Sequence, residues 1–242
     1  GGMATWGSLL VVRTLLVREL GQYDNGLYQA VFGLSNQYVT VFMTWMAAYV
    51  FPRIASRGAG ELSGLLNSAL RANLFLMAPV LCAVAGLRDP LIALFYSHAF
   101  LPAGPLVPVQ ALGDYVRVAA WSLGVCLFAL GRVRAHLLVI VSQNVLWVLL
   151  TLLLVPHFGL PAISAAYALS FLSWPPLVYP MVRGWFAFRL SAANAGLLIA
   201  GLAAVVAAGA APQPLGAAAI PVVPLLVLLE DRWRARGRPP AS

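Results

Sequence analysis

The sequence has 242 residues, of which 62% are hydrophobic and only 9% are charged, and its formal net charge is +8. A soluble domain carries about 25% charged residues, so this composition excludes an ordinary soluble protein. All 15 basic residues are arginines, and most lie in short joints between apolar stretches. This distribution indicates that the positive charge interacts with a membrane surface and not with a nucleic acid. We therefore expect an all-α integral membrane protein with no nucleic-acid partner.

Long apolar stretches follow one another along nearly the whole chain. A transmembrane helix needs about 20 predominantly apolar residues, and the hydropathy pattern predicts a bundle of about eight such helices. The predicted spans are 3–19, 27–51, 65–87, 104–130, 136–155, 160–181, 192–210 and 215–229. No soluble domain fits between them.

Arginines concentrate in every second joint between these spans. The arginine-rich joints contain Arg53 and Arg57, Arg132 and Arg134, Arg183 and Arg189, and finally Arg232, Arg234, Arg236 and Arg238. The alternate joints hold only Arg18 and Arg88, each beside an acidic residue. Because positively charged loops stay on the cytoplasmic side, this pattern predicts an even number of spans and both ends of the chain in the cytoplasm.

The first residues, GGMATWGSLL, are apolar and show no charged segment ahead of a cleavage site. They predict no signal peptide, and we expect the sequence to begin within a longer protein. Cys82 and Cys126 lie within apolar spans, without paired spacing and without a histidine at metal-ligand distance. We interpret them as packing residues and expect neither a metal nor a cofactor.

The first span contains an arginine about ten residues from its start. Arg13 has apolar neighbours and no acidic residue within one turn of its own helix. An ionisable group at the centre of a bilayer costs about 2.5–3.5 kcal/mol, so it needs a partner or a wet cavity. Arg13 is therefore a candidate cavity residue.

The fourth span carries a polar stripe. Gln110, Asp114, Arg117 and Trp121 are separated by four, three and four residues, a spacing that places them on one face of a helix. The i,i+3 pair of Asp114 and Arg117 has two interpretations. It could neutralise itself and lock helix packing, or it could line a cavity.

Two further spans have polar faces. Gln29, Gly33, Asn36 and Thr40 recur at helical spacing in the second span, and the fifth span contains the cluster of residues 142–144. Such residues also mediate ordinary helix packing in lipid, and this alternative stays open. Three polar faces together predict a shared hydrophilic interior, as in secondary transporters. The candidate cavity residues are Arg13, Gln29, Asn36, Gln110, Asp114, Arg117 and Asn144.

Several stretches resemble a known transporter family. The segments GLYQAVFGLSNQYVTVFMTWMAAYVFPRIA (26–55), LFYSHAFLPAGPLVPVQALGDYVRVAAWSLG (94–124) and FGLPAISAAYALSF (158–171) occur in this order. They resemble the C-terminal half of polysaccharide flippases of the multidrug/oligosaccharidyl-lipid/polysaccharide exporter superfamily. The similarity is greatest to flippases that move O-antigen units or the lipid-linked trisaccharide of the enterobacterial common antigen.

The resemblance implies an architecture and a function. Family members have two six-helix bundles that form a V around a central cavity. Residues 1–181 would then be the second bundle, residues 182–230 two additional transmembrane helices, and residues 231–242 a basic cytoplasmic tail. The implied substrate is an undecaprenyl-pyrophosphate-linked oligosaccharide, flipped from the cytoplasmic to the periplasmic leaflet of the bacterial inner membrane for polysaccharide biosynthesis. Polysaccharide polymerase machinery would be a partner beside the membrane lipid.

The resemblance also suggests residue roles. Asp114 and Arg117 correspond to the acid and base of the family's "GD..K/R" element, whereas Asn36 stands where several members have an aspartate. Any ion coupling that used that aspartate would here depend on Asp114 or on another part of the protein. Because arginine suits a pyrophosphate, we expect Arg117 to alternate between Asp114 and the substrate.

Two other functions remain as alternatives. A multidrug or cation antiporter of the same superfamily would be expected to favour acids and aromatic residues over arginines at its binding site. A polytopic glycosyltransferase or acyltransferase would need acids or a histidine displayed at a membrane face. The joints offer Glu19, Asp24, Asp89 and His98, which form no recognised catalytic pair. We therefore expect a transporter and no enzyme.

Overall fold

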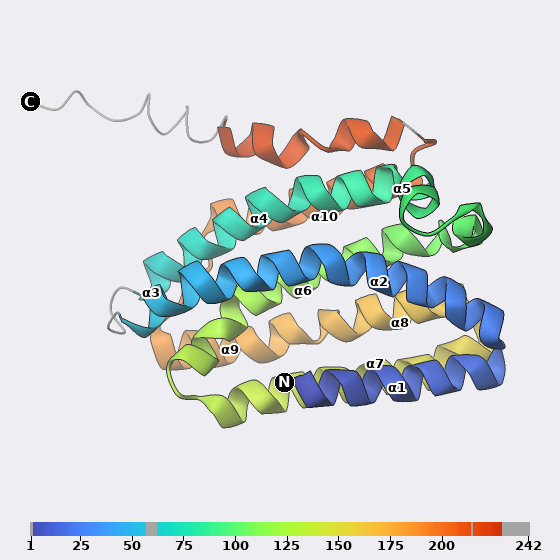
Figure 1. The fold of residues 1–242 in the computed structure, drawn as a ribbon. Helices are drawn as coiled ribbons and strands as arrows, with labels where there is room; N and C mark the ends of the chain where they lie inside the picture. The colour runs from blue at the N-terminus through green and yellow to red at the C-terminus, as the bar shows by residue number, and fades with distance from the viewer. Residues whose placement is uncertain (1, 57–61, 214, 229–242) are drawn as a thin grey trace, which may run out of the picture.

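A computed structural model describes residues 2–56, 62–213 and 215–228, which form helices and short joints and no strand. The long helices lie roughly along one common direction, whereas α5 turns away from it at one end (Figure 1). The order is α1 (Gly2–Glu19), α2 (Gln22–Trp45), the π-helix η1 (Met46–Val50), α3 (Phe51–Ala55), α4 (Leu62–Gly86), α5 (Arg88–Phe95), the 3₁₀-helix η3 (His98–Ala103), α6 (Leu106–Ala129), α7 (Val133–Phe158), α8 (Pro161–Leu172), α9 (Trp174–Phe186), α10 (Ala192–Ala210) and the 3₁₀-helix η4 (Leu215–Ala219). A last short apolar helix continues to Leu228.

Four of the described helices, α4, α6, α7 and α10, are long and apolar enough to cross a membrane. The chain is thus an all-α membrane protein, as predicted. Each of the eight predicted spans coincides with helical structure, but the expected number of eight membrane-crossing helices is not supported. The two-bundle arrangement remains a prediction, because the described residues form one bundle.

Two properties explain why fewer helices are suited to cross a membrane than predicted: charged residues in α1, and a break in the sixth predicted span. The 18 residues of α1 include Arg13, Arg18 and Glu19, which is a high charge content for a membrane span. The sixth predicted span is divided between α8 and α9 at Ser173, just before two consecutive prolines. Average hydropathy does not register such a break, because it counts side chains and not backbone hydrogen bonds.

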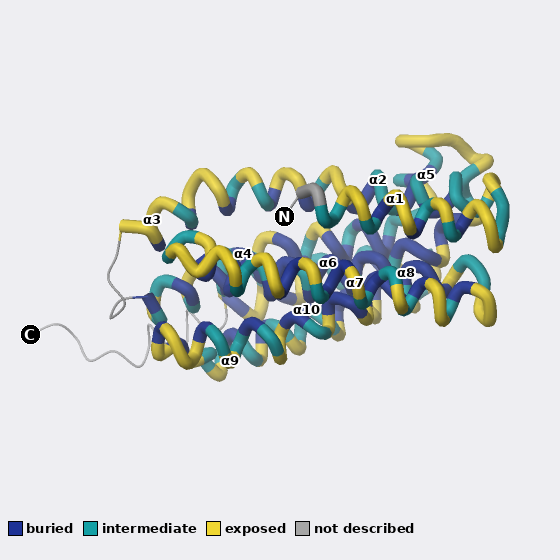
Figure 2. The backbone as a smooth tube through the Cα atoms, turned by 90° about the horizontal axis from the view of Figure 1, so that it is seen from below, coloured by how far each residue is buried: buried dark blue, intermediate teal, exposed yellow. Residues whose placement is uncertain are grey.

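The central helix of the bundle is α6. It packs against α4, α8, α9, α10 and α2, and Figure 2 shows buried backbone in the middle of the bundle. Both the polar stripe of α6 and its apolar face, which includes Val116 and Leu123, are therefore enclosed by protein. A polar group on α6 must consequently find its partners on neighbouring helices.

The arginine-rich joints gather at one end of the bundle. In Figure 1, α3, the joint between α6 and α7 and the end of α9 lie together, opposite α5 and the joint between α1 and α2. Arg132 lies 5.0 Å from the ring centroid of Trp185, and Asn67 donates a hydrogen bond of 2.9 Å to the carbonyl oxygen of Arg189. This grouping is compatible with the predicted orientation, whereas the cytoplasmic location of this end stays a prediction. Arg57 and the basic tail 231–242 lie outside the described residues.

Candidate substrate-binding site

The carboxylate of Asp114 is fully buried in the middle of α6. It accepts three hydrogen bonds of 2.6 Å, from the hydroxyls of Ser35 and Tyr38 to Oδ2 and from the hydroxyl of Tyr167 to Oδ1. An ionised carboxylate only accepts hydrogen bonds, so three hydroxyl donors suit its charge well. These bonds tie α6 to both α2 and α8.

A glycine makes the contact between α6 and α8 possible. A Cβ atom at Gly113 would lie 2.9 Å from Cα of Ala168 and 2.9 Å from ring atom Cδ1 of Tyr167. Real Cβ atoms essentially never approach other atoms so closely, so only glycine lets the two helices come this near. The glycine next to Asp114 in the sequence thus brings Tyr167 to its carboxylate.

The guanidinium of Arg117 lies one turn further along α6. Its Nη1 donates a hydrogen bond of 2.9 Å to the hydroxyl of Tyr167 and lies 3.8 Å from Oδ1 of Asp114. Its Cζ lies 5.5 Å from the ring centroid of Phe171, within cation–π distance. The side chain of Arg117 is 17% exposed, compared with 0% for Asp114. The i,i+3 ion pair therefore exists, and its cation also reaches an accessible surface.

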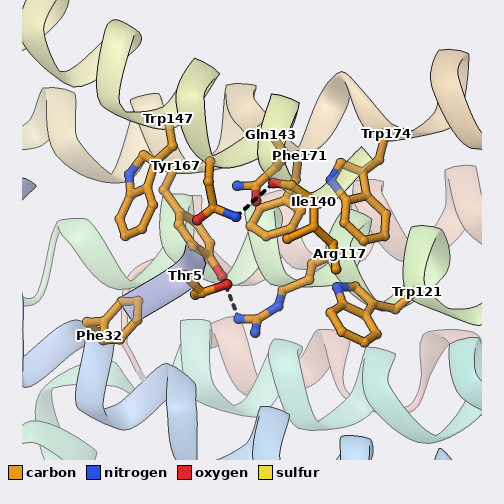
Figure 3. A pocket seen from close by; sticks show the side chains of 11 residues that line it. Thr5, Phe32, Arg117, Trp121, Ile140, Gln143, Trp147, Tyr167, Phe171 and Trp174 are labelled. Carbon is orange, nitrogen blue, oxygen red and sulfur yellow. Dashed lines mark hydrogen bonds between the residues drawn. The ribbon is translucent and has the colours of Figure 1, made fainter. Parts of the chain in front are cut away.

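That surface belongs to two adjoining hollows. The smaller has a volume of about 30 Å³ and is shown in Figure 3. Its walls are Thr5, Phe32, Arg117, Trp121, Ile140, Gln143, Asn144, Trp147, Tyr167, Phe171 and Trp174. The larger has a volume of about 230 Å³ and is lined by Thr5, Trp6, Leu9, Phe32, Asn36, Met43, Arg117, Trp121 and Ile140. We call the two together the central hollow. Arg117 and Trp121 line both of its parts.

Aromatic side chains make up most of the wall of the smaller part of the central hollow. Trp121 stacks on Trp174 with a centroid distance of 5.7 Å, and Phe32 stacks on Trp147 at 6.2 Å. These ring pairs make the wall around Arg117 largely apolar, and a charge interacts more strongly with an ion beside apolar groups than in bulk water. In Figure 3, Arg117 and Trp147 lie on opposite sides of the smaller part of the central hollow.

Only part of the predicted shared interior is found. Asn36 lines the larger part of the central hollow and Asn144 the smaller part, so the structure brings both to Arg117. Gln110 is fully buried, and neither of its side-chain polar atoms makes a hydrogen bond within the described residues. Gln29 is half-buried on α2 and lines neither part of the hollow.

Arg13 lies at a different hollow. That hollow has a volume of about 510 Å³ and is lined by Leu10, Arg13, Thr14, Val17, Arg18 and Asn25. Arg13, Gln29 and Gln110 thus do not line the central hollow with Arg117, and their role as cavity residues stays a prediction. Helical spacing predicts which residues share a face of one helix, but the rotation of that helix against its neighbours is decided by packing.

Two tyrosines of the site were missed by the sequence analysis. Tyr38 and Tyr167 lie inside apolar spans and have no charged neighbour within one turn. A hint was present, because Tyr38 follows Ser35 by three residues and Tyr167 lies three residues from both Ser164 and Ser170. A tyrosine hydroxyl inside a span needs a hydrogen-bond partner, so this spacing could have pointed to a buried acceptor.

The chain has relatives among known proteins, although the similarity is low. No protein-family model matches the sequence, and no solved structure matches the chain. The chain is similar to proteins named lipid III flippase from Escherichia coli (strain K12) and from Shigella flexneri, with 25% identity over 166 residues in each case. Both relatives are thus named as flippases of a lipid. The similarity covers 67% of this chain but only 39% of each relative, so the chain spans much less than the full length of these proteins.

Together with the apolar helices, this similarity supports a multi-pass protein of the inner membrane. It does not specify the lipid-linked cargo. Within the described residues, no group of three or more histidine, cysteine, aspartate or glutamate side chains could hold a metal ion.

Proposed function

We propose that this chain takes part in flipping an undecaprenyl-pyrophosphate-linked oligosaccharide from the cytoplasmic to the periplasmic leaflet, for the synthesis of surface polysaccharide. The observation that carries this proposal is the position of Arg117 at the wall of the central hollow, in the middle of an apolar helical bundle. Within the described residues, its guanidinium makes a single hydrogen bond, to Tyr167. Most of its five N–H donors therefore remain for a ligand.

The chemistry of the cargo fits this arrangement. A pyrophosphate that crosses the hydrocarbon region needs a compensating cation, and the planar fork of arginine matches phosphate oxygens in a bidentate manner. Apolar rings beside Arg117 lower the local polarity, which strengthens the attraction between the guanidinium and an anion. In this proposal the sugars and the pyrophosphate enter the central hollow while the lipid tail stays in the bilayer. The similarity to lipid III flippases supports the same class of cargo.

The electrostatics of the hollow favour an anionic ligand over a cationic one. The carboxylate of Asp114 is enclosed by three hydroxyls and has no exposed surface, whereas the guanidinium of Arg117 faces the hollow. A cationic drug in the hollow would meet the cation first and be repelled. A multidrug or cation antiporter is therefore the weaker proposal.

We also propose that the chain acts as a transporter and not as a polytopic glycosyltransferase or acyltransferase. The acidic residues and the histidine that an enzyme could use lie in two different joints at one end of the bundle. The accessible cation Arg117 lies away from them, in the middle of α6. Transfer or hydrolysis of a lipid-linked sugar by the purified protein would contradict this proposal.

The decisive experiment replaces Arg117 with alanine in the natural gene. We expect a loss of transport of about tenfold or more, because a hydrogen bond to a charged group contributes about 1.5–3 kcal/mol and 1.4 kcal/mol corresponds to a factor of ten. Transport is measured as restoration of surface polysaccharide in a flippase-deficient strain, at matched amounts of protein in the membrane. The matched control is Arg134→Ala, which removes an exposed arginine in the first turn of α7, outside the central hollow. Undiminished transport by Arg117→Ala would overturn the proposed function.

A further inference from the structure

The hydroxyl of Tyr167 lies between the two charges of the site. It donates a hydrogen bond of 2.6 Å to Oδ1 of Asp114 and accepts one of 2.9 Å from Nη1 of Arg117. A tyrosine hydroxyl carries one proton. Because this proton is directed to Asp114, the oxygen is left to accept from Arg117. The three groups therefore form a directed chain from cation through hydroxyl to carboxylate.

This chain keeps the two charges apart. The distance of 3.8 Å between Nη1 of Arg117 and Oδ1 of Asp114 is too long for a hydrogen bond. At the same time, the hydroxyls of Ser35 and Tyr38 occupy the other carboxylate oxygen. Asp114 therefore has its hydrogen bonds without direct contact to the guanidinium.

We propose that Tyr167 is a positioning residue, which holds Arg117 off Asp114 and so keeps the guanidinium available to a pyrophosphate group in the central hollow. The inference rests on the proposed function, in that it assumes an anionic ligand at Arg117. Without the hydroxyl, Oδ1 of Asp114 loses a donor, and the nearest donor that can replace it is Nη1 of Arg117. A direct, charge-assisted arginine–carboxylate pair would then compete with the ligand.

The ring of Tyr167 is held independently of its hydroxyl. It packs edge-on against Phe171 with a centroid distance of 4.9 Å and against Trp147 with a distance of 5.6 Å. The atoms of Tyr167 nearest to a Cβ position at Gly113 are the ring atoms Cδ1 and Cε1. Tyr167→Phe keeps all of these ring contacts and removes the bridging oxygen alone.

The experiment combines two substitutions and measures binding to the detergent-solubilised full protein. The probes are inorganic pyrophosphate and farnesyl pyrophosphate, which separate recognition of the anion from recognition of a lipid-linked anion. We expect Tyr167→Phe to weaken binding of both probes about tenfold. Addition of Asp114→Asn should restore binding to within about threefold of the original protein, because a neutral amide no longer holds the guanidinium.

If Tyr167 had a purely structural role, the double variant would not bind the probes better than the single variant. Asp114→Asn removes a second element of the same buried network, so the double variant would then bind no better than Tyr167→Phe. That result, or unchanged binding by Tyr167→Phe, would overturn the inference. If Arg117→Ala impairs transport and Tyr167→Phe does not impair binding, only the positioning role fails. If Arg117→Ala leaves transport intact, the proposed function itself fails.

A second measurement needs no double variant. Phenylglyoxal reacts with accessible guanidinium groups, and mass spectrometry can follow the peptide that contains Arg117. We expect this arginine to react several-fold more slowly in Tyr167→Phe than in the original protein, because it becomes paired with Asp114. The reaction of exposed Arg134 serves as the internal reference. An equal or faster reaction of Arg117 in Tyr167→Phe would contradict the proposal.

Discussion

Arg117 and Arg13 both lie well inside long helices, but their surroundings differ. Arg117 belongs to the central helix α6, is bound by Tyr167, and faces a hollow with aromatic walls. Arg13 belongs to α1 and is half-buried at a wider hollow that also contains Arg18. Within the described residues, the side chain of Arg13 makes no hydrogen bond or ion pair.

The comparison shows that depth in a helix does not by itself make an arginine a ligand site. A guanidinium on a long, flexible stem can reach polar surroundings unless the neighbouring helices hold it in place. Helices on several sides pack against α6, and the rings of Trp147 and Phe171 pack against Tyr167 next to Arg117. We therefore assign the anion site to Arg117, and the following substitutions test the difference between the two arginines.

The largest effect after Arg117→Ala is expected for Gly113→Ala, because it disturbs the surroundings of Arg117 without touching its charge. The new methyl group would press on Cα of Ala168 and on the ring of Tyr167. Overpacking of this kind costs about 1–3 kcal/mol, and it moves Tyr167 away from Asp114. We expect a fall of the thermal unfolding midpoint and at least a tenfold loss of transport.

The matched control for this substitution is Gly196→Ala in α10. A Cβ atom at Gly196 meets no atom within 4 Å, so this variant should keep its stability and transport. Equal behaviour of the two variants would show that the close approach of α6 and α8 is not required.

An intermediate effect is expected for Asn36→Asp, which places a negative charge at the wall of the hollow that Arg117 lines. Two unit charges at about 4 Å in water interact by about 1 kcal/mol, so repulsion of an anionic cargo should lower transport about fivefold. Asn36→Ala separates the charge from the loss of the amide and should have a smaller effect. Stimulation of cation export by Asn36→Asp would instead favour an antiporter.

The smallest effect is expected for Arg13→Ala. Because Arg13 lies at a separate, wider hollow, transport should change by less than about twofold at matched protein amounts in the membrane. A loss as large as that of Arg117→Ala would remove the distinction between the two arginines and would require both hollows to take part in transport.

Much of the fold could be predicted from hydropathy and spacing. The helices α4, α6, α7 and α10 agree closely with the spans predicted at 65–87, 104–130, 136–155 and 192–210. The number of membrane-crossing helices was harder to predict from the sequence. The hydropathy of 160–181 is that of one span, yet the backbone divides there between α8 and α9.

The candidate site could be predicted only along single helices. The separation of three residues between Asp114 and Arg117 predicted their ion pair, which the structure contains at 3.8 Å. The partners from other helices could not be predicted, because Ser35 is 79 residues and Tyr167 is 53 residues from Asp114. The spacing of residues within one helix gives no information about contacts with residues of another helix.

The sequence by itself determined that this protein is helical, belongs in a membrane, and has an acid and a base one turn apart on α6. These properties follow from composition and local spacing, which act along one segment at a time. Only the tertiary structure decided that Tyr167 separates the two charges and that Arg117, rather than Arg13, faces the aromatic hollow. Those relations depend on the rotation and close approach of whole helices, which are set by packing at positions such as Gly113.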